Sequence, residues 1–125
     1  MREYLDIVES GAEQEAWYMK GGCYQFALFL NSLTGLPLYG LVDESGALHH
    51  AFVVNGETAI DARGESSLDS IAIYKGRKSA GVKIVPVDRS EVEEYNHGPL
   101  TDEEFDECIS YANEHDQLAQ IIDQY

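Results

Sequence analysis

The hydrophobic positions in the first half of the chain predict one largely buried helix. The segment CYQFALFLNSL begins at Cys23. Its apolar residues recur at helical intervals, at Phe26, Ala27, Leu30 and Leu33. Leu28 and Phe29 between them are also apolar, so we expect this helix to be buried on most sides. Gly35 and Pro37 are expected to end it.

Short apolar segments after this helix predict an antiparallel sheet. The expected strands are residues 38–42, 48–54, 57–61 and 82–87. Residues 43–46 predict a turn, and Asn55-Gly56 is the strongest short-range signal for a hairpin. Pro86 indicates that the last strand lies at a sheet edge or ends there.

Helical segments are expected on both sides of the strands. They are residues 2–9, 13–19, 89–95, a helix that starts at Thr101, and the tail 116–125. Residues 62–81 are expected to be a loop with a short helix. Thr101 and Glu104 have the spacing of a capping box, which marks a helix start. We therefore expect one α+β domain over residues 1–125, with the Cys23 helix packed on a small antiparallel sheet.

The charge of the chain narrows the range of partners. Its 125 residues include 23 acidic and 8 basic ones, for a formal net charge of −15. This balance argues against nucleic acid and anionic membranes as partners, because both are bound through Lys and Arg. It favours a basic protein as a partner.

The number of cysteines and the N-terminal segment indicate the cellular compartment of the protein. Two cysteines are too few for a disulfide framework. The first residues contain no apolar core of a signal peptide, and no stretch approaches the ~20 apolar residues of a membrane span. We expect a reduced, cytoplasmic setting, and export by a route without such a signal stays open.

Cys23 is the strongest candidate for a reactive residue. It follows Gly21 and Gly22 and occupies the first turn of the predicted helix. Unpaired N–H groups and the helix dipole at that point favour a thiolate, and the same N–H groups could hold an oxyanion. Cys108, on the apolar face of a later helix, is instead expected to be a small buried core residue.

The predicted hairpin selects one histidine as a base. If Asn55-Gly56 are the two central residues of the turn, the strands pair so that His50 lies directly opposite Asp61. The neighbouring His49 points to the other face, opposite a residue without a polar side chain. A carboxylate beside a histidine fixes its tautomer and stabilises the imidazolium. The alternative is a structural His–Asp pair on an exposed sheet face.

This arrangement resembles the papain-like superfamily of cysteine hydrolases. Gly-Gly-Cys opens a buried helix, a later strand carries His, and the next strand carries Asp. Papain-like, NlpC/P60-type and transglutaminase-type domains share this order, and the resemblance covers residues 17–64. It implies that Cys23 is the nucleophile, His50 the general base and Asp61 the orienting acid.

The chain departs from the papain-type pattern ahead of the cysteine. The glutamine that helps to hold the oxyanion has no counterpart at the expected spacing, and the nearest candidate is Gln14. Tyr18, Tyr24 or backbone amides could take its place. The short spacing from Cys23 to the histidine implies a minimal version of the domain.

Five residues near the predicted site are candidates for substrate binding: Gly22, Tyr24, Trp17, Tyr18 and Arg63. Gly22 lets the backbone approach a substrate closely. Trp17 and Tyr18 either wall a substrate cleft or belong to the core. Arg63 either binds a carboxylate or ties down its loop through a salt bridge. We recognise no set of metal ligands and expect no cofactor.

The expected function is a cysteine-dependent peptidase, amidase, deamidase or acyl transferase that acts on a protein or peptide substrate. Two alternatives stay open. One is an acidic binding or inhibitory protein, for example a nucleic-acid mimic, in which the acidic segments 91–94 and 102–104 matter more than Cys23. The other is a catalytically degenerate papain-like domain that binds substrate-like tails.

Overall fold

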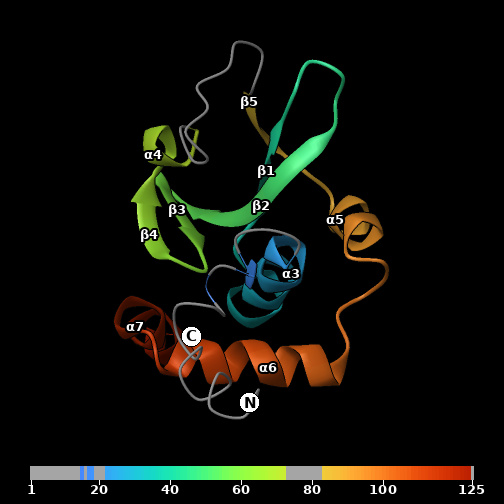
Figure 1. Cartoon of the computed structure of the whole chain (residues 1–125). Coiled ribbons are helices and arrows are strands. Elements are labelled where there is room, and N and C mark those ends of the chain that lie inside the picture. Colours follow the sequence, from blue (N-terminus) through green and yellow to red (C-terminus); the bar gives the residue numbers. More distant parts are fainter. Residues whose placement is uncertain (1–14, 16, 19–21, 73–82, 125) are drawn as a thin grey trace, which may run out of the picture.

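A computed structural model describes residues 15, 17, 18, 22–72 and 83–124 of the chain (Figure 1). The predicted helix 2–9 lies outside these residues. Of the predicted helix 13–19, the structure describes Glu15, Trp17 and Tyr18, all three of which are helical. The domain is α+β, as the order of apolar segments predicts.

The helix that begins at Cys23 has the predicted extent. Helix α3 spans Cys23–Thr34, and residues 26–30 are all buried. It ends at Gly35, which adopts the left-handed conformation with a φ of 78° and donates its N–H to the carbonyl of Asn31. Glycine adopts this conformation at little cost, which is why it stops the helix here.

The strands form one antiparallel sheet with the order β4-β3-β2-β1-β5. Their bounds are Leu38–Val42 for β1, Leu48–Asn55 for β2, Thr58–Asp61 for β3, Gly64–Ser67 for β4 and Lys83–Pro86 for β5. Pro86 ends an edge strand, as expected, because proline cannot donate a hydrogen bond to a neighbouring strand.

The expectation of a loop over residues 62–81 was wrong in its first part. The polar segment 64–67 forms strand β4, which pairs with β3, and helix α4 follows at Leu68–Ala72. A tight turn at Ala62-Arg63 joins the two strands. The backbone N–H of Arg63 donates to the Asp61 carboxylate over 2.9 Å, a local bond that stabilises such turns. Residues 73–82 of this segment and of the next predicted strand lie outside the described residues.

The predicted pairing register of the β2–β3 hairpin was also wrong. Asn55 pairs with Thr58, so the two central residues of the turn are Gly56 and Glu57 rather than Asn55 and Gly56. Gly56 has a φ of 67°, as the first central residue of a type II′ turn requires. The true register differs from the predicted one by two residues, so each side chain keeps its predicted face of the sheet.

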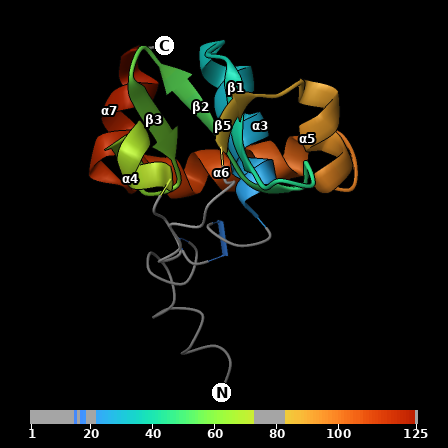
Figure 2. The same ribbon diagram turned by 90° about the horizontal axis from the view of Figure 1, so that it is seen from above.

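Helices cover both faces of the sheet (Figure 1). The larger apolar cluster joins α3 to one face, and three C-terminal helices complete it: α5 at Arg89–Tyr95, α6 at Asp102–Asn113 and α7 at Asp116–Gln124. Helix α3 lies between the sheet and α6, and Figure 2 shows α5 and α7 at opposite ends of this layer. On the other face, α4 covers a smaller cluster that includes Phe52, Val54 and Ile71.

The C-terminal helices are fixed by specific polar contacts. The predicted capping box is present at the start of α6, where the Thr101 side chain accepts the Glu104 N–H and Glu104 accepts the Thr101 N–H. Arg89 of α5 donates to the Asn31 side chain of α3 over 2.6 Å. No helix in the described ranges is long and apolar enough to cross a membrane.

Candidate functional site

Cys23 is the first residue of α3 and is 2% exposed. Its N-cap is Gly22, and the first turn of the helix carries no acidic residue that would offset the dipole. The Tyr24 hydroxyl lies close enough to the Cys23 thiol for the two to interact electrostatically. Burial raises the pKa of Tyr24, and the charge of Cys23 raises it further. The Tyr24 hydroxyl donates to the Leu48 carbonyl over 3.1 Å, which ties the start of α3 to β2.

The Trp17 ring fills the space that a side chain at position 22 would need. A Cβ atom at Gly22 would overlap the Trp17 indole. This close approach gives Gly22 a packing role, in addition to the role that sequence reasoning assigned to it. It also fixes the Trp17 ring next to the residue that precedes Cys23.

His50 and Asp61 form a buried pair. His50 Nε2 lies 3.0 Å from Asp61 Oδ2, and the two side chains are 0% and 3% exposed. In the observed register Asp61 is the diagonal neighbour of His50, not the residue directly opposite. A diagonal contact lies within reach of a long side chain on the same face. The predicted contact therefore forms, although the register used to predict it was wrong.

Arg63 holds the Asp61 carboxylate in place. The Arg63 backbone N–H and Nε donate to Oδ1 over 2.9 and 3.4 Å, and Nη2 donates to Oδ2 over 3.1 Å. Burial by itself raises the pKa of Asp61, but hydrogen bonds from His50 and Arg63 outweigh it and lower the pKa below its usual value. Asp61 is therefore a carboxylate at neutral pH, and it accepts a hydrogen bond from the N–H of His50 Nε2. Of the two roles considered for Arg63, the structure shows the one that ties down the loop.

A β-bulge adjoins His50. The pairing of β1 with β2 skips His49, so β2 carries one extra residue at this point. As a result, Leu48 and Ala51 both join the apolar cluster on the α3 side of the sheet, although strict alternation would separate them. Bulges redirect the neighbouring side chains and are frequent beside active sites.

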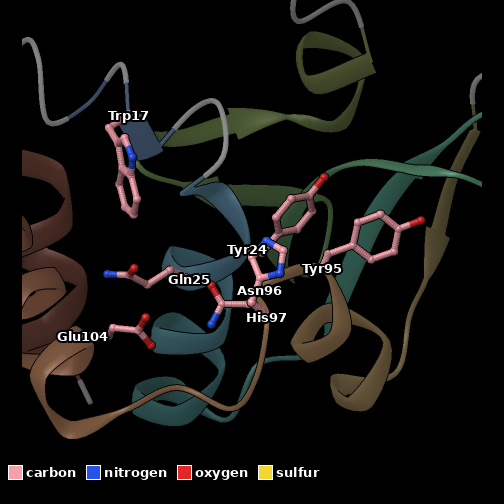
Figure 3. Close-up of a pocket in the computed structure, with 7 residues that line it drawn as sticks. All are labelled: Trp17, Tyr24, Gln25, Tyr95, Asn96, His97 and Glu104. Atoms are coloured by element: carbon pink, nitrogen blue, oxygen red, sulfur yellow. The ribbon is translucent and has the colours of Figure 1, made fainter.

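A pocket of about 550 Å³ opens next to the start of α3 (Figure 3). Three aromatic residues line it: Trp17, Tyr24 and Tyr95. The polar lining residues are Gln25, Asn96, His97 and Glu104. The walls therefore come from the start of α3, the end of α5 and the start of α6. Two of the predicted substrate-binding residues, Trp17 and Tyr24, belong to this pocket.

Other candidates lie elsewhere. Tyr18 is buried in the main core, where its ring packs against Phe26 and Tyr111. Cys108 is fully buried, as expected, and burial raises the pKa of its thiol to about 11. His49 is exposed and lies 2.7 Å from Asp43, a partner that the sequence reasoning did not consider.

Sequence reasoning missed most of the pocket. Tyr95 and Gln25 fall within predicted helices, and the sequence pattern assigns no role to them or to Asn96 and His97. The signal for His97 lies in Asn-His-Gly-Pro at the end of α5, a breaker sequence. His97 adopts a φ of 66°, which is uncommon for a residue other than glycine. In the part of the chain that the structure describes, no three potential metal ligands gather into one group.

No protein-family model, curated protein or solved structure matches this chain.

Proposed function

We propose that the protein is a cysteine-dependent hydrolase or acyl transferase with Cys23 as nucleophile, His50 as general base and Asp61 as orienting carboxylate. The observation that carries this proposal is the buried His50–Asp61 pair, held by three hydrogen bonds from Arg63. A buried carboxylate is a poor source of stability, because desolvation offsets much of its attraction to its partners. A pair of this kind beside a bulge, in a fold with a cysteine at a helix start, fits a catalytic role.

The hydrogen-bond pattern defines the role of each nitrogen of His50. Because Asp61 is ionised, Nε2 carries the proton that points at Oδ2, and the Nδ1 lone pair is the proton acceptor. Nδ1 takes the proton of the Cys23 thiol, and the thiolate attacks the substrate carbonyl carbon. The carbonyl π electrons move to oxygen, and N–H groups at the start of α3 stabilise the resulting oxyanion.

The second half of the reaction reverses these proton transfers. The tetrahedral intermediate collapses, the C–N bond breaks, and the leaving amine takes the proton from the His50 imidazolium. This leaves a thioester on Cys23. Water, or an amine acceptor, then gives a proton to Nδ1 as it attacks the thioester, and the Cys23 thiolate leaves and regains the proton.

The resemblance to papain-like domains supports the same assignment. In both, a helix that begins with the cysteine packs on an antiparallel sheet, and neighbouring strands carry the histidine and the acid. The papain-type glutamine, which helps to hold the oxyanion, has no counterpart here. Tyr24 can take its place, because its hydroxyl lies beside the Cys23 thiol.

The two cysteines allow a matched test. Both thiols are buried, but Cys23 lies at a helix start, which favours the thiolate, whereas burial raises the pKa of Cys108 to about 11. We therefore expect iodoacetamide to label Cys23 faster than Cys108 at neutral pH. Cys108→Ser should leave the labelling rate of Cys23 unchanged, and His50→Asn should reduce it. Slow and equal labelling of both cysteines in the folded protein would contradict the proposal.

A second candidate is a binding domain without catalytic activity. Cys23 and His50 are 2% and 0% exposed, so a substrate carbonyl reaches the sulfur only after neighbouring groups move. A protein that binds peptides through the pocket in Figure 3 would need no such movement. Peptide binding that is unaffected by Cys23→Ser, together with no turnover of any peptide amide or ester, would favour this candidate.

A further inference from the structure

The aromatic residues of the pocket are unusually accessible. Trp17 is 49% exposed and Tyr95 is 36% exposed, and both belong to its walls. Among the described residues these are the two large hydrophobic side chains that face solvent. Exposed aromatic surface that gathers in a concave site, next to polar groups, is typical of ligand recognition.

The charge of the lining determines which ligands fit. Glu104 lines the pocket, and no Lys or Arg is among its described lining residues. A second hollow of about 440 Å³ shares His97 and adds Glu93 and Glu94. Arg89 pairs with Glu93 over 3.3 Å, and Glu94 and Glu104 add negative charge to the two hollows. With a net charge of −15 on the whole chain, an anionic group would be repelled from this surface.

Aromatic faces beside a carboxylate recognise organic cations. A Lys or Arg side chain can lay its apolar stem along Trp17 while its charged head approaches Glu104. The NH2 groups of Gln25 and Asn96 donate within the protein, Gln25 to Glu107 and Cys108 and Asn96 to the Gly98 carbonyl, so these two side chains shape the pocket. In Figure 3 the Trp17 ring and the Glu104 carboxylate approach Gln25 from two different segments of the chain.

We propose that this pocket binds a lysine or arginine side chain of a peptide, next to the amide that Cys23 attacks. The position in the chain links the two sites, because Tyr24 and Gln25 line the pocket and directly follow Cys23. The part that concerns attack at the adjacent amide rests on the proposed function. The binding of a cationic side chain does not.

Trp17 makes this proposal measurable without any reaction. It is the single tryptophan of the chain and it lines the pocket, so its fluorescence reports occupancy directly. The probes are three capped tetrapeptides, acetyl-Ala-Xaa-Ala-Ala-amide, in which the second residue is lysine, norleucine or glutamate. At low ionic strength we expect the lysine peptide to bind about 5-fold or more tighter than the norleucine peptide, and the glutamate peptide to bind weakest.

Glu104→Gln tests the charge with little risk to the fold. Glutamine also serves at this position of a capping box, so α6 keeps its start. We expect about 3- to 10-fold weaker binding of the lysine peptide and no change for norleucine. Glu103→Gln is the matched control, because it removes the same charge from the neighbouring exposed position, outside the pocket, and should change the Kd less than 2-fold. Equal affinity for all three peptides by calorimetry, or equal effects of the two variants, would overturn the proposal.

The two proposals fail in different ways. Lysine-peptide binding that survives Cys23→Ser, in a protein that never turns over a peptide, would remove the catalytic function and leave the cation pocket. Peptide turnover that depends on Cys23, with the same kcat/KM for lysine, norleucine and glutamate peptides, would leave the catalytic function and remove the cation pocket.

Discussion

Replacement of Asp61 by asparagine separates the charge of this carboxylate from its shape. In the native protein two carboxylate oxygens accept four donors: His50 Nε2, and the N–H, Nε and Nη2 of Arg63. Asparagine has one oxygen, and its NH2 group faces the donors that the second oxygen served. Either the Arg63 turn or the His50 ring then lacks an acceptor.

The size of the effect follows from this count. Each hydrogen bond to a charged, buried group contributes roughly 1.5–3 kcal/mol, and the contribution of the half-exposed Arg63 head is smaller because water screens it. We expect Asp61→Asn to lower the free energy of unfolding by about 3 kcal/mol at pH 7, which is within the range for breaking one side of a buried pair. For a slope of ~2 kcal/mol per molar urea, the midpoint of unfolding falls by ~1.5 M.

The pH dependence of the free energy of unfolding tests whether the charge of Asp61 causes this loss of stability. The folded-state pKa of Asp61 lies below the unfolded value, so its carboxylate stabilises the fold above pH ~4, and this contribution is lost as the pH falls through the folded-state pKa. The difference between wild type and Asp61→Asn should therefore be largest near neutral pH and shrink in acid. Asp43→Asn is the control, because Asp43 also contacts a histidine, His49, over 2.7 Å, but near the surface. This variant should therefore lower the free energy of unfolding by less than Asp61→Asn does.

The same variant tests the role of Asp61 in the proposed reaction. An asparagine NH2 group facing His50 favours the tautomer with its proton on Nδ1, which cannot accept the thiol proton. We expect a fall in kcat on the order of 10³-fold or more, with a smaller change in peptide binding. An unfolding midpoint equal to that of wild type at pH 7, or a difference that grows in acid, would refute this account of the pair.

Variants at three further positions test the local structure. Gly56→Ala should lower stability by about 1 kcal/mol in thermal unfolding because of the φ of 67° at this position; an unchanged melting temperature would argue against the turn assignment. Thr101→Ala removes the cap of α6 and should cost about 1 kcal/mol in urea unfolding, an effect that Thr101→Ser largely avoids. Gly22→Ala places a methyl group where the Trp17 ring lies, so the fluorescence maximum of Trp17 should shift; an unchanged spectrum would contradict this packing.

The local features that follow from the sequence are those with a strong local cause. Helix α3 carries an uninterrupted apolar pattern and a glycine that tolerates left-handed geometry, so both its start and its end were predictable. The capping box of α6 depends on two side chains within one turn. Strand β4 was missed because GESS has no apolar alternation, and it forms because the turn at Ala62-Arg63 brings it against β3.

For the candidate site, the pattern of residues is enough to place Cys23 at a helix start and to put His50 and Asp61 on the same face of the sheet. The face survived a register error because side chains alternate with a period of two, and the error was of two residues. Three features appear only in the folded structure. Arg63 donates hydrogen bonds to Asp61, and a bulge adjoins His50. Trp17, Tyr95 and Glu104 line one pocket. The pocket residues lie far apart in the chain, and the packing of α5 and α6 around α3 brings them together, which no local pattern of residues encodes.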